Sequence, residues 1–288
     1  MRSDPILACV TLGTLVALAT GCSQAPPPAF TDTTGEAKAA VVEYPAGPYG
    51  IGVGSVVANY DFIGYGDATA TTATMQALSL ADFYNPHAHD SSYQPAAGEQ
   101  DDRLFPADSG FASAGKPKPT VLLVDIASVW CGPCNDEAGT ILPMKHDLYA
   151  ACGGEFLLDL HDSLTPGTPA TPSNLKQWTI KYKVGYPAAI DPSDQLDKLF
   201  AAQAFPQNMI VDTTTMKVVA VVAGEAVTGV CSDNATVCGT PADLALCADA
   251  TKYSCGLPTA CPSGPCQQYQ FWTQYEALLD KTRTGCTL

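Results

Sequence analysis

The stretch VDIASVWCGPCNDE, residues 124–137, joins an apolar run with one acid to a tryptophan and two cysteines held apart by Gly-Pro. The run TVLLVDIA, residues 120–127, is continuously aliphatic and β-branched, which predicts a strand buried on both faces. A helix is predicted from about Pro133 to Ala150, because proline suits the first helical turn. The two cysteines are therefore expected where a buried strand leads into a helix.

That position gives the two thiols different chemistry. Cys131 is expected at the helix N-terminus, where unpaired N–H groups and the helix dipole favour an anion. A lowered thiol pKa would make it a thiolate nucleophile. Cys134 lies one turn deeper and can attack a mixed disulfide formed at Cys131. The pair is therefore predicted to be a redox-active dithiol.

The chain after the pair alternates between strand and helix patterns. Strands are predicted at EFLLDL (155–160), QNMIVD (207–212) and KVVAVVAG (217–224), and helices at NLKQWTIKYKV (174–184), PSDQLDKLFAAQ (192–203) and CQQYQFWTQYEALLDKTR (266–283). Alternating elements that end in two adjacent strands indicate an α/β sheet with an antiparallel edge. Residues 226–266 are rich in cysteine and poor in helix signals.

On these residues the chain resembles the thioredoxin superfamily. WCGPC, with Asp125 six residues before Cys131, follows the thioredoxin pattern. VVANYDFIGY, YPAAIDPSDQLDKLF and FPQNMIVD extend the likeness over roughly residues 50–225 to exported, membrane-tethered TlpA-like thiol–disulfide oxidoreductases. The resemblance implies a thioredoxin-like three-layer α/β fold with a central mixed sheet. To this the chain adds an N-terminal extension and a cysteine-rich insertion before the last helix.

The resemblance also implies the catalytic residues. Cys131 would be the nucleophile and Cys134 the resolving thiol. Asp125 matches the buried acid of thioredoxins, and Glu137 a glutamate that the exported branch carries three residues after the second cysteine. A carboxylate in apolar surroundings has a raised pKa and can accept a proton near pH 7. The residues leave two alternatives open: a strand-end acid bonded to backbone for Asp125, and a first-turn acid favoured by the dipole for Glu137.

Three further residues are implied as the substrate-binding surface. Pro206 matches the superfamily's cis-proline, which faces the dithiol, although an ordinary loop proline is the alternative. Phe205 precedes it, at the position whose backbone pairs with the substrate chain. Trp130 lies directly before the dithiol. These residues are expected to receive a disulfide-containing protein client.

The N-terminus indicates export. Residues 1–21 have the layout of a signal peptide, and the small residues before Cys22 resemble a bacterial lipobox. Cleavage there would leave Cys22 lipidated; an ordinary cleaved signal and a retained membrane helix are the alternatives. Residues 22–45 are predicted to be a flexible tether and residues 46–288 the thioredoxin-like domain.

The remaining cysteines fit a disulfide framework. Of the twelve, eight lie outside the signal, the lipid site and the dithiol: Cys152, Cys231, Cys238, Cys247, Cys255, Cys261, Cys266 and Cys286. An even number in an exported protein indicates disulfides. In the superfamily's topology, Cys152 and Cys286 follow helices that end at the same end of the domain, so they are predicted to pair. The other six would then pair among themselves, either beside the dithiol as a wall that restricts clients or as a cover for the sheet edge.

Charge and motifs exclude several other functions. The net charge of −15 and the absence of a basic cluster make nucleic acid a poor partner. Zinc would need a second ligand pair, and a copper site at His87 and His89 would lack fixed partners, so no metal and no cofactor are predicted. The peroxiredoxin loop, the nucleophile elbow and the phosphate loop are absent.

The sequence therefore predicts an enzyme, an extracytoplasmic thiol–disulfide oxidoreductase that reduces client disulfides. It is expected on the periplasmic side of a bacterial cell envelope, anchored to the membrane by lipid and re-reduced by a membrane electron donor. The alternative is a disulfide-stapled surface lipoprotein that uses a thioredoxin-like frame as a binding module, with the pair permanently closed.

Overall fold

The computed structural model describes residues 43–67, 74–106, 108–111, 115–191, 204–226, 229–230, 237–238 and 265–288. Only the backbone is described for residues 229–230, 237–238 and 265–270. The chain divides into two units, Met1–Lys38 and Ala39–Leu288, and every described residue belongs to the second. The predicted signal peptide, the lipidation site at Cys22 and most of the tether lie outside the described residues.

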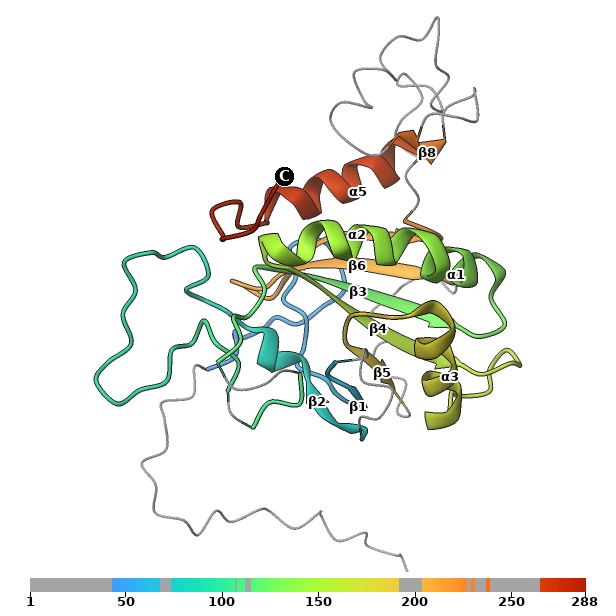
Figure 1. The fold of residues 1–288 in the computed structure, drawn as a ribbon, viewed down its shortest axis with the longest axis horizontal. Helices are drawn as coiled ribbons and strands as arrows, with labels where there is room; N and C mark the ends of the chain where they lie inside the picture. Colours follow the sequence, from blue (N-terminus) through green and yellow to red (C-terminus); the bar gives the residue numbers. More distant parts are fainter. Residues whose placement is uncertain are drawn as a thin grey trace, which may run out of the picture. The chain divides into compact units, whose positions relative to one another are not determined.

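A seven-stranded mixed sheet forms the middle layer, in the order β2-β1-β5-β4-β3-β6-β7 (Figure 1). The strands are β1 (Asp61–Tyr65), β2 (Gln76–Ser79), β3 (Val121–Ser128), β4 (Gly154–Asp162), β5 (Ala188–Ile190), β6 (Gln207–Asp212) and β7 (Lys217–Ala223). β3, β4 and β5 are parallel, and the remaining pairings are antiparallel. A separate short pair joins β8 (Gly229–Val230) to β9 (Val237–Cys238).

The central strand β3 is buried along its whole length. Its aliphatic residues alternate between the two faces of the sheet, as side chains in a strand must. Leu123 and Ala127 enter one core, whereas Leu122, Val124 and Ile126 enter the other. Burial of Asp125 inside this run is therefore an exception that calls for a chemical reason.

Helices cover one face of the sheet. The helix after the dithiol comprises α1 (Gly132–Asp136), the π-helical turn η2 (Glu137–Ile141), α2 (Leu142–Tyr149) and the 3₁₀ turn η3 (Ala150–Cys152). α3 (Pro172–Tyr182) and α5 (Pro265–Ala277) pack on the same core, and α5 lies beside α2 in Figure 1. Large aromatic side chains dominate this core, among them Tyr149, Phe156 and Trp272.

The opposite face is covered by the N-terminal part of the domain. Val56, Val57 and Phe62 pack there together with the short 3₁₀ helix η1 (Leu80–Phe83). Phe83 contacts Phe111, with ring centroids 4.2 Å apart. Two cores on the two faces of one sheet give the predicted three-layer α/β architecture, with the thioredoxin-like strand order.

A disulfide joins Cys152, after the first long helix, to Cys286 near the C-terminus, with Cα atoms 4.7 Å apart. This is the pairing expected from the sequence. Gly153 ends the helix at a positive φ of 84°, where a Cβ would meet the Arg283 guanidinium at 2.9 Å. The backbone N–H of Asp280 also donates to Cys152 O at 2.9 Å. The C-terminal segment is therefore fixed to the start of β4.

The predicted elements agree with the structure where it describes them, with differences in detail. The long helix contains the π-helical turn at Glu137, and α5 ends at Ala277 rather than near Arg283. The helix predicted at 192–203 lies outside the described residues. So do Cys231, Cys247, Cys255 and Cys261, and of Cys238 and Cys266 only the backbone is described, so their disulfides and their place relative to the dithiol remain predictions. Among the described helices, none has the length and apolar character needed to span a bilayer.

Candidate active site

The two cysteines form a disulfide at the start of the long helix, with Cα atoms 5.3 Å apart. Cys131 is the N-cap of α1, and its Sγ accepts the backbone N–H of Cys134 at 3.1 Å. The cysteines are 3% and 1% exposed, whereas the intervening Gly132 and Pro133 are exposed. An N–H group aimed at Cys131 Sγ would stabilise a thiolate there in the reduced protein.

Aromatic rings lie beside the disulfide. Trp130 is 40% exposed and meets Phe205 edge to face, with centroids 5.9 Å apart. The peptide bond between Phe205 and Pro206 is cis, as the resemblance implies. The backbone N–H of Gly224 donates to Pro206 O at 2.8 Å. The structure thus brings the dithiol helix and the Phe205–Pro206 turn to the same end of the sheet.

Two further residues that contact these rings were not predicted from the sequence. His161 stacks on Phe205, with centroids 5.4 Å apart. Asp162 accepts the indole N–H of Trp130 at 2.9 Å and the backbone N–H of Gly167 at 3.0 Å. Both residues end β4, and because β3 and β4 are parallel, their carboxyl ends meet at one edge. That rule could have located them.

The two predicted acids are buried on the helix side of the sheet. Asp125 is 2% exposed and Glu137 1%. Burial, followed by the charges of Glu137 and Asp159, raises the pKa of Asp125 well above its usual value. Burial also raises the pKa of Glu137, to about 8, although N–H groups from Ala226 and Asn208 oppose the rise. A carboxyl group with such a pKa can exchange a proton near neutral pH.

Asn208 is a further residue at the acids that sequence reasoning missed. It lies opposite Asp125 in the β3–β6 register. Its Nδ2 donates to the two oxygens of Glu137 at 3.1 and 3.3 Å. The backbone N–H of Ala226 donates to Glu137 Oε1 at 2.7 Å, and Ala226 O accepts the indole N–H of Trp272 at 2.6 Å. Glu137 is therefore held by β6 and by the chain after β7, and α5 in turn binds that chain.

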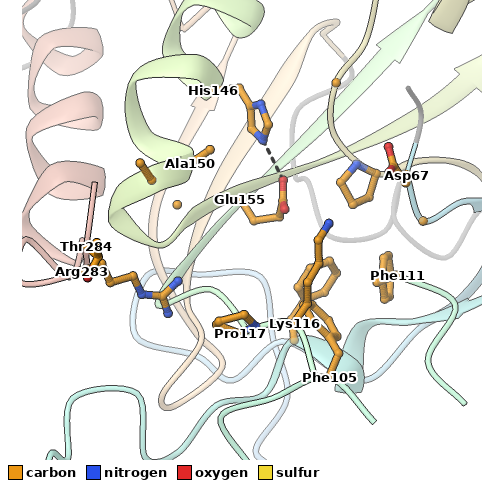
Figure 2. A pocket seen from close by; sticks show the side chains of 16 residues that line it. Asp67, Phe105, Phe111, Lys116, Pro117, His146, Ala150, Glu155, Arg283 and Thr284 are labelled. Carbon is orange, nitrogen blue, oxygen red and sulfur yellow. Dashed lines mark hydrogen bonds and ion pairs between the residues drawn. The ribbon is translucent and has the colours of Figure 1, made fainter. Parts of the chain in front are cut away.

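A cavity of about 700 Å³ lies at the other end of the sheet (Figure 2). Its lining includes Pro117, which precedes β3, and Gly154, the first residue of β4. His146 Nε2 and Glu155 Oε1 lie within hydrogen-bond distance in its wall, 3.0 Å apart. The eight residues of β3 rise by about 3.3 Å each, which separates this cavity from the dithiol by more than about 20 Å. It is no part of the dithiol site.

The histidines weighed as copper ligands occupy a different region. His87 stacks on Tyr93, with centroids 3.7 Å apart, and its Nε2 lies 3.6 Å from Asp102 Oδ2. Within the described ranges, no three His, Cys, Asp or Glu side chains are grouped closely enough to hold a metal ion. Tyr93 and Asp102 thus fix the position of the His87 ring.

Comparisons with known proteins give only distant structural likenesses. No family model matches the chain, and no curated protein matches it. Among solved structures it is similar to a thiol:disulfide interchange protein provisionally assigned as DsbE from Chlorobium tepidum, with 16% identity, a TM-score of 0.40, and 60% of this chain and 86% of the other covered. It is also similar to the thioredoxin domain of a thiol-disulfide oxidoreductase from Bacteroides vulgatus (16%, TM-score 0.39, 59% and 87%). A third is a secreted thiol-disulfide isomerase from Corynebacterium glutamicum (16%, TM-score 0.38, 59% and 77%). Since these TM-scores are below 0.5, the fold assignment rests on the strand order and no functional conclusion is drawn from the likenesses.

Proposed function

We propose that the protein is a thiol–disulfide oxidoreductase that reduces disulfides of protein clients through Cys131 and Cys134. The observation that carries this proposal is the convergence of a helix-start disulfide, the contact between the Trp130 and Phe205 rings and a buried acid pair at one end of the sheet. A disulfide that served only to staple the chain would need neither the helix N-terminus nor two buried carboxyl groups beside it.

Reduction of a client disulfide proceeds in two thiol–disulfide exchanges. In the reduced protein the Cys131 thiolate attacks a client disulfide, which forms a mixed disulfide and releases one client thiolate. Glu137 or its neighbour Asp125 accepts the proton of Cys134. The Cys134 thiolate then attacks Cys131 Sγ, which closes the bond seen in the structure and releases the second client thiolate. Two electrons pass to the client, and a dithiol donor must restore the protein.

We place this reaction outside the cytoplasm, with the chain held to the membrane by lipid on Cys22 and the donor in the membrane. The signal-like N-terminus and the Cys152–Cys286 disulfide support this location, because such bonds persist in oxidising compartments. The Gly-Pro dipeptide supports a reductant, since it is the dipeptide of thioredoxin, whose potential is about −270 mV against about −120 mV for a strong oxidant. Mass spectrometry of the protein extracted from membranes tests whether Cys22 is lipidated.

The trapping of a client tests the proposed reaction. Cys134→Ser should accumulate a mixed disulfide between Cys131 and a client peptide, because attack proceeds and resolution cannot. Cys131→Ser should accumulate none and should reduce no insulin. Equal trapping by the two variants would contradict the roles assigned to the two thiols.

The alternative is a binding module whose disulfide stays closed. Its support is the burial of both cysteines, at 3% and 1% exposed, in the disulfide form. The binding module predicts that Cys131→Ser and Cys134→Ser bind a client with the same affinity as the wild type. The reductase predicts that both lose turnover.

A further inference from the structure

The Glu137 carboxyl group receives N–H donors from two directions. Asn208 Nδ2 reaches its two oxygens at 3.1 and 3.3 Å, and the Ala226 backbone N–H reaches Oε1 at 2.7 Å. Asn208 is 0% exposed, so water does not compete for this contact. Hydrogen bonds donated to a carboxylate stabilise its charged form. These donors therefore favour loss of the Glu137 proton.

Asp125 has the opposite surroundings. Its Oδ1 is buried and has no hydrogen-bond partner in the described part of the chain. The amide of Asn208, its cross-strand neighbour, donates to Glu137 instead. A buried carboxyl oxygen without a donor is more stable when the group is protonated. The Asn208 amide thus stabilises the charged form of Glu137 and leaves Asp125 without this donor.

The Ala226 donor is itself held in place. Trp272 Nε1 donates to Ala226 O at 2.6 Å, and Trp272 is 0% exposed. The peptide carbonyl is therefore bound by α5 while Glu137 accepts the N–H of the same residue. Rotation of this segment away from Glu137 would leave the buried indole N–H without its acceptor, which is costly. Trp272 accordingly directs the Ala226 N–H toward Glu137.

We propose that Asn208 and Trp272 are positioning residues for Glu137. The Asn208 amide donates to the Glu137 carboxyl group, and Trp272 holds the Ala226 N–H that also donates to it. As the pH rises, Glu137 therefore loses its proton before Asp125 does. The inference deepens the proposed function and rests on it in one respect: it makes Glu137 the base that activates Cys134. Asp125 then stays protonated during resolution. Neither Asn208 nor Trp272 is required to touch the reacting sulfurs.

The other titratable groups around the acids act on this preference in both directions. They are Cys131 and Cys134 on α1, Asp159 on β4, Tyr186 before β5 and Glu225 after β7. Cys131 and Cys134 do not titrate in the disulfide form. The charge of Asp159 raises the pKa of Asp125, and that of Glu225 raises the pKa of Glu137. Burial and the two acids raise the pKa of Tyr186 well above its usual range, so it stays neutral. The N–H donors are the influences that lower the pKa of Glu137.

A carboxyl titration by ¹³C NMR tests the proposal on the oxidised protein, without a client. The Glu137 side-chain signal is assigned from its loss in Glu137→Gln. Asn208→Leu removes the amide donor, and Trp272→Phe removes the indole N–H but keeps an aromatic ring. Each should raise the titration midpoint of Glu137 by about one to two pH units, the size expected for a hydrogen bond to a charged group. The midpoint of the pH profile for client reduction should rise equally.

The chain offers a matched control for each variant. Gln207 is the neighbour of Asn208 on β6, is 1% exposed, and its amide atoms have no hydrogen-bond partner among the described residues. The indole nitrogen of Trp178 is likewise buried and has no partner within those ranges. Gln207→Leu and Trp178→Phe should leave the Glu137 midpoint within about 0.3 pH units, because neither side chain donates to Glu137.

The outcomes separate this inference from the proposed function. Midpoints in Asn208→Leu and Trp272→Phe that shift no further than in the controls would overturn the inference, even if the wild type is active. A shift in Asn208→Leu alone would overturn the role of Trp272. A wild type that reduces no disulfide at any pH would overturn the reductase proposal and leave the titration result standing. If Asn208→Leu does not fold, judged by near-ultraviolet circular dichroism, Asn208→Ala removes the same donor without added bulk.

Discussion

The indole N–H of Trp130 donates to Asp162 Oδ2 at 2.9 Å, so a carboxylate at the end of β4 orients the exposed ring beside the dithiol. The same carboxylate accepts the Gly167 N–H at 3.0 Å and is 4% exposed. A buried acceptor that holds two donors fixes geometry more firmly than an exposed one. The exposed Trp130 ring is thus positioned by a strand that carries no cysteine of the dithiol.

Loss of that acceptor should reduce the use of protein clients more than the use of small disulfides. Asp162→Ala frees the Trp130 ring, and kcat/KM for insulin should fall about tenfold, the equivalent of one charged hydrogen bond. The rate with a small aromatic disulfide should stay within about twofold, because Cys131 is unchanged. Asp162→Asn, which retains an acceptor oxygen, is the control. Equal losses with the two substrates would refute a positioning role.

The buried Glu137 should make stability depend on pH. Its pKa of about 8 exceeds the ordinary 4.5, so the folded protein holds a proton that the unfolded chain releases. Stability from this group is therefore complete below about pH 4.5 and is lost as the pH rises toward 8. The urea midpoint of the oxidised protein should decrease between pH 5 and 8.5. Glu137→Gln should have a shallower decrease; an equal or steeper decrease would exclude Glu137 as its source.

Removal of both acids should slow resolution mainly near neutral pH. Asp125→Asn combined with Glu137→Gln leaves Cys134 without a buried base, whereas at high pH the thiolate forms unaided. The single-turnover rate of client release should be at least about tenfold lower at pH 6.5 and approach the wild type at pH 9. A constant ratio of the two rates from pH 6 to 9 would argue against proton transfer.

The Cys152–Cys286 bond should contribute strongly to stability because its cysteines are 134 residues apart. The loop-entropy relation gives about 5 kcal/mol for such a closure before any strain. Cys286→Ser should lower the free energy of unfolding in urea by a value approaching this. The control is Cys131→Ala with Cys134→Ala, which opens a bond between residues three apart and should cost far less. A smaller loss of unfolding free energy in Cys286→Ser than in the control would contradict a stabilising role for the Cys152–Cys286 disulfide.

Local patterns were sufficient to predict the site's framework. The buried strand, the WCGPC turn and the proline before QNMIVD each lie within one short segment. The burial of Asp125 was also foreseeable, because it lies within the strand that was predicted to be buried. The hydrogen bonds that hold Glu137 in place could not be predicted from the sequence. Asn208 and Ala226 lie 71 and 89 residues after Glu137, and their contacts depend on strand register and on the end of β7.

Trp272 shows the same limit more clearly. The pattern of the last helix marks an apolar face, but it cannot show that one indole N–H binds a carbonyl 46 residues earlier. The π-helical turn at Glu137 was also not predicted, because such turns are rare and occur mostly as single turns inside α-helices. Tertiary packing thus decides the hydrogen bonds around the acids, while sequence motifs decide which residues are brought there.

Differential alkylation under graded dithiothreitol tests the redox-active dithiol most directly. The folded protein is equilibrated with increasing reductant, quenched, alkylated and mapped by mass spectrometry. The proposed function predicts that the Cys131–Cys134 bond opens first and that Cys131 is the first residue labelled, while Cys152, which is 0% exposed, stays bonded to Cys286. Opening of Cys152–Cys286 while Cys131–Cys134 remains closed would contradict a redox-active dithiol and identify Cys131–Cys134 as a structural disulfide.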